Sequence, residues 1–233
     1  MSVVDHLTEL RGRIIISMIA ISLAAIVCFI FSESIIKFFV DYYRDATEGD
    51  RNQLIFLGPL DGFLTRVKVA TYGGIVLALP IWLWEMWRFI TPGLNPKEKR
   101  YAIPFVFTSI VLFAIGAAVA LLTLPKALEF LLNVGGDQLS PELTADKYLS
   151  FASLMIVAFG VAFEFPVVLV FLLLARVLTT SQLRRWRRPA IVIIVIFAAV
   201  ITPSQDPYSL FFMVIPMYVF YEGSIIVGRL LKR

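Results

Sequence analysis

Six long runs of apolar, almost uncharged residues constrain this 233-residue chain more than any other feature of its sequence. The hydrocarbon core of a bilayer requires roughly 20 mostly apolar residues for each helical span. Charged residues make up only 16% of the chain, whereas a soluble domain carries about a quarter. The runs therefore predict an all-α integral membrane protein in which residues 1–233 form a single membrane domain. The six predicted transmembrane helices are residues 14–31, 69–90, 101–124, 150–175, 189–201 and 208–228.

The first run is expected to remain in the protein as a span. It is 18 residues long, longer than the apolar core of an ordinary signal peptide, and no small-residue cleavage site follows it. Its Cys28 is the only cysteine of the chain, so an internal disulfide is impossible. We interpret Cys28 as an apolar packing residue.

The basic residues predict the orientation of the spans. With six spans, both termini lie on one side together with residues 91–100 and 176–188, and these segments hold 13 basic residues against three acids. The other side holds seven basic residues against 11 acids. Because lysine and arginine are enriched in cytoplasmic segments, we predict an N-in and C-in topology. The positive net charge is then a topology signal, and no nucleic-acid partner is predicted.

The last two predicted spans are short. Residues 189–201 give about 20 Å of helix at 1.5 Å per residue, and the apolar part of the sixth span ends at Glu222, with Pro216 inside it. Both are shorter than a hydrocarbon core, so we expect local thinning of the bilayer or snorkelling side chains. A re-entrant hairpin is the alternative, but basic residues at both flanks favour two spans.

Aromatic and amphipathic residues lie around the predicted spans. Residues 32–68 alternate apolar and charged stretches, which is typical of segments that lie at the membrane interface. Trp82, Trp84 and Trp87 stand near the inner end of the second span. We interpret these three residues as an interfacial aromatic belt.

The sequence offers little chemistry for an enzyme. It has no G-x-x-x-x-G-K-[ST] phosphate loop, no G-x-S-x-G elbow and no H-E-x-x-H motif. One histidine, His6, is too few for the usual zinc or haem sites, and no cofactor or metal is predicted. The spans offer only Glu85, Arg88, Glu164 and Glu222 as charged groups. We therefore predict that the protein is not an enzyme.

Three acids stand on the basic inner side: Asp5, Glu9 and Glu98. Glu9 and Arg13 are four residues apart, so they can pair on a helix. These acids can simply offset their basic neighbours. Alternatively, they form a site for a cationic ligand, and an arginine ligand fits best because its guanidinium group binds a carboxylate through two parallel hydrogen bonds.

Two further acids are conspicuous. Glu164 is the only charged residue between Ser150 and Ala175, and a charge near mid-bilayer costs on the order of 2.5–3.5 kcal/mol on insertion scales. Pro166 is expected to bend the helix nearby, so Glu164 either lines a partly wet pocket or is buried and hydrogen-bonded to another span. Asp206 lies in the predicted outer turn TPSQDP, where an acid before proline favours a turn.

Five motifs resemble the TatC family, the multispanning receptor component of the twin-arginine protein translocase. They are HLTELRGR, FITPGLNPKEKR, AFGVAFEFPVVL, TPSQDP and IPMYVFYE, and they occur in family order over almost the whole chain. The resemblance implies six transmembrane helices with short fifth and sixth spans in a concave, glove-like arrangement.

The resemblance also implies a function and partners. A protein of this family binds the twin-arginine signal peptides of folded cargo at the cytoplasmic face. It assembles with small single-span subunits of the TatA and TatB type and with further copies of itself. Transport uses the proton-motive force, and the protein is a multi-pass component of the cytoplasmic (inner) membrane with both termini cytoplasmic.

The resemblance assigns roles to individual residues. The signal-peptide site would comprise Glu9, Leu10, Arg11, Phe89, Pro92 and Glu98. Glu164 matches the intramembrane acid of the family, Asp206 its outer-turn acid, and Pro59 and Phe63 a patch of the first outer loop. Leu210 departs from the family pattern, since many members carry glutamine there, which makes the partner contact at this position apolar.

Two other functions are consistent with a polytopic membrane protein. The first is a proton-coupled small-molecule transporter with Glu164 as the proton carrier. Such transporters usually contain inverted repeats and discontinuous helices, and neither is evident in the sequence. The second is a purely structural subunit, which would leave the inner acids and Glu164 unexplained.

Overall fold

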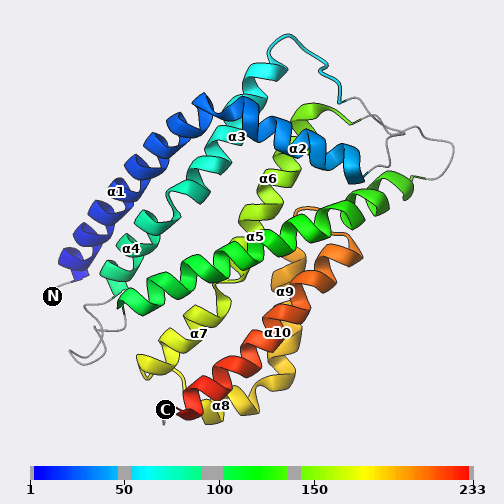
Figure 1. Cartoon of the computed structure of the whole chain (residues 1–233). Coiled ribbons are helices and arrows are strands. Elements are labelled where there is room, and N and C mark those ends of the chain that lie inside the picture. Colours follow the sequence, from blue (N-terminus) through cyan, green and yellow to red (C-terminus); the bar gives the residue numbers. More distant parts are fainter. Residues whose placement is uncertain (1–2, 47–53, 91–101, 136–142, 231–233) are drawn as a thin grey trace.

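The computed structural model describes residues 3–46, 54–90, 102–135 and 143–230, and these segments are helical almost throughout. Short parallel pairing of Ile55 with Thr144 joins two connecting segments. Figure 1 shows the helices as a bundle in which α5 crosses the others obliquely. The helices of these segments are α1 (Val3–Ile30), α2 (Ser32–Ala46), α3 (Asp61–Leu77), α4 (Leu79–Ile90), α5 (Ala102–Asn133), α6 (Ala145–Ala162), α7 (Phe165–Leu174), α8 (Thr180–Arg185), α9 (Arg187–Ile201) and α10 (Pro207–Leu230).

Helices occupy all six predicted spans. Within the residues that the structure describes, four apolar stretches are long enough to cross a membrane: His6–Ile30, Ile103–Asn133, Ala145–Leu174 and Pro207–Leu230. The pair α3 and α4 passes the same test as one bent span. Helix α9 has 15 residues, or about 22 Å, so the fifth predicted span is short as expected. Several helices extend well beyond the apolar runs because polar residues continue the same backbone hydrogen bonds.

The second and fourth predicted spans are each broken. Helices α3 and α4 meet at Ala78 with a bend of 53°, and Pro80 stands in the first turn of α4. Helix α6 ends at Ala162 and α7 begins at Phe165, with Pro166 in its first turn. Proline is favoured in a first helical turn because it has no N–H to donate. The helix is thus broken next to Pro166, although Ala145–Leu174 still counts as one membrane-spanning stretch. The predicted bend stays a prediction.

The expectation of a short sixth span is wrong. Helix α10 continues for 24 residues through both Pro216 and Glu222, which gives about 36 Å of helix. Glu222 does not interrupt the helix because its Oε2 accepts a hydrogen bond from Nη2 of Arg187 at 2.5 Å. Its Oε1 accepts a second one from the hydroxyl of Tyr218 at 3.4 Å. A paired charge of this kind is tolerated where an isolated one is not.

Close helix contacts depend on small residues. A Cβ at Gly116 of α5 would lie 2.6 Å from the carbonyl oxygen of Phe159 in α6, and a Cβ at Gly160 would lie 2.5 Å from the ring of Phe113. On the other side of the bundle, a Cβ at Gly74 would lie 2.7 Å from the backbone nitrogen of Ala25. Glycine lets helices in membranes approach until their backbones touch, and this fixes α5 on α6 and α1 on α3.

Helix α2 packs against the bundle. Its Phe39 and Tyr43 belong to the main core, and the hydroxyl of Tyr148 in α6 donates to the carbonyl oxygen of Phe39 at 2.8 Å. The opposite face of α2 carries exposed charges, among them Asp41. The predicted amphipathic character of this segment is thereby explained by packing on the protein itself.

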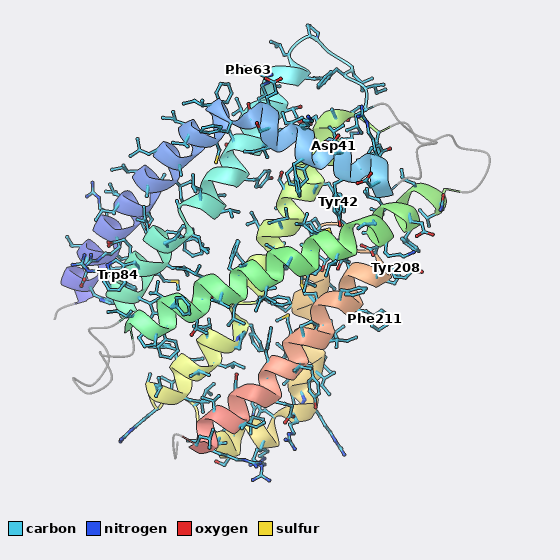
Figure 2. All side chains as sticks on the ribbon, in the orientation of Figure 1. Asp41, Tyr42, Phe63, Trp84, Tyr208 and Phe211 are labelled. Carbon is cyan, nitrogen blue, oxygen red and sulfur yellow. The ribbon has the colours of Figure 1, made fainter. Side chains whose placement is uncertain are left out.

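The interpretation of all three tryptophans as one interfacial belt is wrong. Trp87 is buried and stacks on Phe105 at a centroid distance of 4.6 Å. Trp82 is half-buried, and its Nε1 donates to the carbonyl oxygen of Ile75 at 3.0 Å. Of these three tryptophans only Trp84 is exposed, on the side of α4 that faces away from the bundle (Figure 2). Cys28 is buried, which confirms it as a packing residue.

Candidate functional site

The first candidate site lies where the amino-terminal turns of α1 meet the end of α4. The apolar run begins at Ile14, but α1 starts at Val3, so its first three turns present polar side chains. The ring of His6 stacks on Phe89 of α4 with the centroids 4.4 Å apart. The two helices pack against each other, which brings Arg13 of α1 beside Glu85 of α4.

Arg13 joins two carboxylates at this contact. Its Nη2 lies 3.1 Å from Oε1 of Glu9, and its Nη1 lies 2.8 Å from Oε2 of Glu85. The side chain of Glu85 is only 8% exposed, and its other oxygen is 3.7 Å from Nη1 of Arg88. Two arginines thus neutralise Glu85, and the pairing of Glu9 with Arg13 expected from their spacing is confirmed.

One carboxylate oxygen of the cluster is left over. Oε2 of Glu9 is buried and has no hydrogen-bond partner within the described part of the chain. An unsatisfied carboxylate oxygen is costly to keep away from water. Glu9 therefore retains an acceptor that a donor from outside the described residues can use.

The other residues of the expected signal-peptide site divide into two groups. Leu10 and Phe89 are half-buried, and Arg11 is exposed on α1 close to Glu9. Pro92 and Glu98 lie outside the described residues. The structure therefore brings Glu9 and Phe89 to one helix contact. That Glu9 and Glu98 belong to one binding site stays a prediction.

Sequence reasoning missed Glu85 as a site residue. The sequence shows Glu85 as one of four charged residues in the predicted spans, and this number is too small to indicate catalysis. Its signal was the same as that of Glu164: a lone acid inside an apolar run, here WLWEMWRF. Glu85 and Arg88 are three residues apart on α4, a spacing that permits pairing on a helix.

The second candidate site is the break between α6 and α7. Glu164 occupies the cap position of α7, but its side chain caps no backbone group. Its side chain lies within reach of the hydroxyl of Ser109 on α5. Neither Oε1 of Glu164 nor Oγ of Ser109 makes a hydrogen bond of normal geometry among the described residues, and both atoms are buried. The carboxylate thus stands at the helix break without an ion pair among the described residues, and Ser109 is its polar neighbour.

An apolar pocket of about 320 Å³ lies next to this break. Pro166 and Val167 of α7 line it, together with Phe105 and Leu112 of α5. Glu164 itself is not among the lining residues. That Glu164 lines a partly wet pocket stays a prediction. Burial against another span stays its alternative.

Asp206 closes the turn between α9 and α10. It is buried, its Oδ1 accepts from the backbone N–H of Ser209 at 2.8 Å, and its Oδ2 accepts from the hydroxyl of Ser204. Gln205 before it has a φ of 50°, a left-handed conformation that completes the tight turn. These hydrogen bonds are ordinary turn and capping chemistry.

Leu210 lies one turn into α10 and packs against the main core as a half-buried residue. Its neighbours Tyr208 and Phe211 are exposed (Figure 2). The first turns of α10 therefore present an apolar surface away from the bundle. A contact between Leu210 and a partner helix stays a prediction.

The outer-loop patch lies just before and within α3. Pro59 and Phe63 are both exposed, and Phe63 stands at the start of α3 in Figure 2. Oδ2 of Asp61 accepts from the backbone N–H groups of Leu57 and Gly58 at 2.9 and 2.8 Å. This turn holds the two apolar side chains outward from the chain.

The described residues contain no group of three or more histidine, cysteine, aspartate or glutamate side chains placed to hold a metal ion. The arrangement described above consists of ion pairs and unpaired acceptors on helices. It can bind positively charged or hydrogen-bonding groups.

Comparison with known proteins gives consistent matches over nearly the whole chain. The family model "Sec-independent protein translocase protein (TatC)" matches residues 5–216. The TatC protein of Frankia casuarinae is 40% identical over 100% of this chain and 67% of its own length. The TatC protein of Aquifex aeolicus is 39% identical over 100% of this chain and 97% of its own length.

Solved structures match as well. A crystal structure of the twin-arginine translocase receptor TatC is similar with a TM-score of 0.80 and 38% sequence identity, covering 98% of this chain and 100% of the other. A crystal structure of the twin-arginine translocase receptor TatC in DDM has a TM-score of 0.79 and 38% sequence identity, covering 96% of this chain and 99% of the other.

Proposed function

Because the chain belongs to the TatC family and is the receptor subunit of a Sec-independent, twin-arginine protein translocase, we propose that its inner face binds twin-arginine signal peptides through Glu9 and Glu98. The family is a translocase component and not an enzyme. Membership in it replaces the alternative of a small-molecule transporter.

The unpartnered Oε2 of Glu9 supports this proposal best. Arg13 is already shared between Glu9 and Glu85, so the charge of Glu9 is only partly neutralised. A guanidinium group of the signal peptide completes the pairing, with Leu10, Arg11, Phe89 and Pro92 around it. Glu98 takes the second arginine.

We propose further that the six helical spans cross the cytoplasmic membrane with both termini inside and enclose a concave, glove-like surface. The excess of basic residues on one side supports this topology. In Figure 1 the two chain ends lie at the same end of the bundle.

The translocase assembles from several subunits. We propose that single-span subunits of the TatA and TatB type dock on α9 and α10 near Leu210 and Asp206. In this proposal, Glu164 offers its free oxygen to a transmembrane helix of a partner or to the inserting signal peptide. Pro59 and Phe63 extend the contact surface on the outer side, where further copies of the chain also associate. The proton-motive force drives transport of folded cargo.

Binding of a labelled twin-arginine peptide to the purified protein in detergent, followed by fluorescence anisotropy, tests the inner site. Glu9→Gln is expected to weaken binding about tenfold, because a hydrogen bond to a charged group contributes roughly 1.5–3 kcal/mol. Glu98→Gln should do the same, and the double variant should bind no better than either. The parent should also discriminate against a Lys-Lys version of the peptide.

Glu33→Gln is the matched control, because Glu33 is an exposed acid on α2 at the other end of the bundle. It should leave peptide binding unchanged. Parental affinity in both Glu9→Gln and Glu98→Gln would contradict the proposed site.

A further inference from the structure

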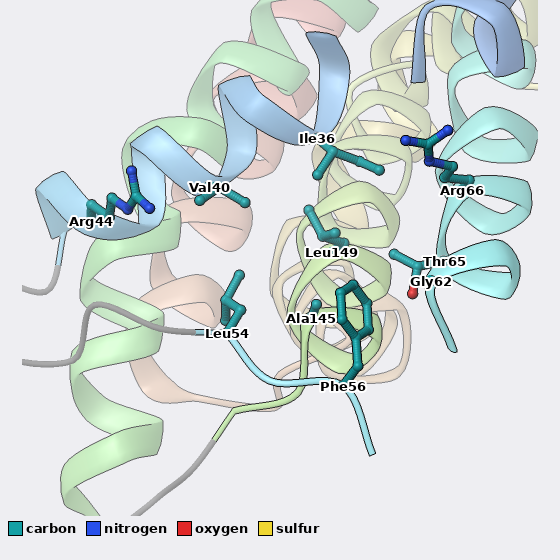
Figure 3. A pocket seen from close by; sticks show the side chains of 10 residues that line it. All are labelled: Ile36, Val40, Arg44, Leu54, Phe56, Gly62, Thr65, Arg66, Ala145 and Leu149. Atoms are coloured by element: carbon teal, nitrogen blue, oxygen red, sulfur yellow. The ribbon is translucent and has the colours of Figure 1, made fainter. Parts of the chain in front are cut away.

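A pocket at the end of the bundle opposite the two chain ends has no part in the proposed function. We refer to it as the outer pocket. It has a volume of about 510 Å³ and lies between α2, the segment around residues 54–56, α3 and the start of α6 (Figure 3). Its walls combine apolar side chains with two arginines.

The arginines come from different helices. Arg44 stands in the last turn of α2 and Arg66 in α3, and both line the outer pocket (Figure 3). Arg44 lies 3.8 Å from Asp41, and both of these side chains are more than half exposed, so this ion pair contributes little. Arg66 forms no ion pair with any residue that the structure describes. In contrast, Lys68 nearby is held at 2.8 Å by Asp146.

The remainder of the pocket is apolar, with Leu54, Phe56 and Leu149 among its lining. Thr65 also lines the pocket, but its hydroxyl is buried. The residue is 1% exposed, and its Oγ1 has no hydrogen-bond partner among the described residues. Binding pockets typically combine such apolar walls with a few polar groups that orient the ligand.

The arginines and the apolar side chains of the outer pocket require two different groups on a ligand. Guanidinium groups bind phosphate through paired hydrogen bonds, so the arginines select an anionic headgroup. The apolar walls gain free energy only by contact with an apolar chain. A free phosphate would leave these walls in water. A neutral lipid would leave Arg44 with only its weak exposed pair to Asp41 and Arg66 with no ion pair among the described residues.

We propose that the outer pocket binds an anionic phospholipid, with the phosphate at the arginines of the rim and an acyl chain along Leu54, Phe56 and Leu149. The position supports a lipid, because the ends of membrane-spanning helices lie at the depth of the headgroups. The exposed side chains of Leu57 and Phe63 beside the pocket extend the apolar surface.

Native mass spectrometry of the purified protein with added phosphatidylglycerol tests the proposal, with phosphatidylcholine of the same chains as the neutral probe. The parent should retain phosphatidylglycerol at least tenfold more strongly. Arg44→Gln/Arg66→Gln should abolish this preference. Arg184→Gln/Arg185→Gln is the matched control, since it removes the same charge from exposed positions of the other end and should change nothing.

A second variant tests the apolar part of the site. A side chain at Gly62 would first meet the ring of Phe56 at 3.9 Å, so Gly62→Leu fills the outer pocket without a backbone clash. It should reduce binding of both lipids at least fivefold. Gly223→Leu is its control, because a Cβ there meets no atom within 4 Å. Thermal unfolding of each variant verifies that it is folded.

Three results would overturn the proposal. The first is equal retention of the two lipids by the parent. The second is unchanged binding in Arg44→Gln/Arg66→Gln or in Gly62→Leu. The third is complete displacement of the lipid by millimolar inorganic phosphate, which would make the site a phosphate site without an acyl-chain component.

Discussion

Glu85 and Glu164 are both acids inside apolar runs, yet the structure treats them in opposite ways. Glu85 is almost fully buried and is paired with Arg13 of another helix and Arg88 of its own. Glu164 stands at a helix break with a carboxylate oxygen that has no partner in the described part of the chain. A paired charge can hold two helices together, whereas an unpaired one gives the free molecule no such contact.

The two arrangements predict different losses on mutation. Removal of a buried pair should be measured as lost stability. Removal of the unpaired acid should be measured as lost transport with little change in stability. The following experiments test this distinction, in order of decreasing effect on the free energy of unfolding.

Arg13→Gln should produce the largest loss. It removes the closer of the two arginine partners of the buried Glu85, and removal of one partner from a buried ion pair typically costs about 3–5 kcal/mol. Unfolding in mixed detergent micelles measures the change. The double variant Arg13→Gln/Glu85→Gln should recover most of the loss.

As a control, Lys126→Gln breaks an exposed pair with Glu129 and should cost less than about 1 kcal/mol. A small effect of Arg13→Gln would show that the inner cluster does not hold α1 on α4.

Gly116→Ala should have the next largest effect, because it acts on the helix contact beside the break. The added Cβ would lie 2.6 Å from the carbonyl oxygen of Phe159, so the backbone of α6 must shift. Overpacking of this kind costs about 1–3 kcal/mol. The same unfolding assay measures it, with Gly223→Ala as the control in open space. Equal stabilities of the two variants would mean that α5 and α6 can separate without cost.

Glu164→Ala should change the free energy of unfolding by less than about 1 kcal/mol, because the carboxylate makes no ion pair among the described residues and its polar neighbour is the single hydroxyl of Ser109. Export of a twin-arginine reporter should nevertheless fall at least tenfold, while binding of the signal peptide at the inner face remains. Glu164→Gln should retain more export than Glu164→Ala if hydrogen bonding is what matters. Normal export by Glu164→Ala would assign the acid to packing.

Leu210→Gln should have the smallest effect on stability. Leu210 is only half-buried on the first turn of α10, and polar substitutions at such positions usually change stability by about 0.5 kcal/mol. Cysteine crosslinking from position 210 to a single-span subunit measures the contact, with position 223 as the control. Absence of any crosslink from position 210 would argue against docking at this turn.

The sequence alone was sufficient for the class of fold and for helices in all six predicted runs, while a crossing of the membrane by each of the six stays a prediction. Uncharged runs of such length have few stable environments other than lipid, and within lipid a single segment must satisfy its backbone as a helix. The break near Pro166 was also predictable, because proline affects the backbone locally. The pairing of Glu9 with Arg13 followed from their spacing for the same reason.

Tertiary structure decided the features that depend on which residues face one another. Trp87 is buried and not interfacial because α5 and α7 bring Phe105 and Phe171 against it. The sixth span runs through Glu222 because Arg187 of α9 reaches that acid. Glu85 has its role only because the first turns of α1 place Arg13 beside it, 72 residues away along the chain. Each charge is present in the sequence, but the energy of a buried charge depends on its partner, and partners are brought together only by the packing of helices.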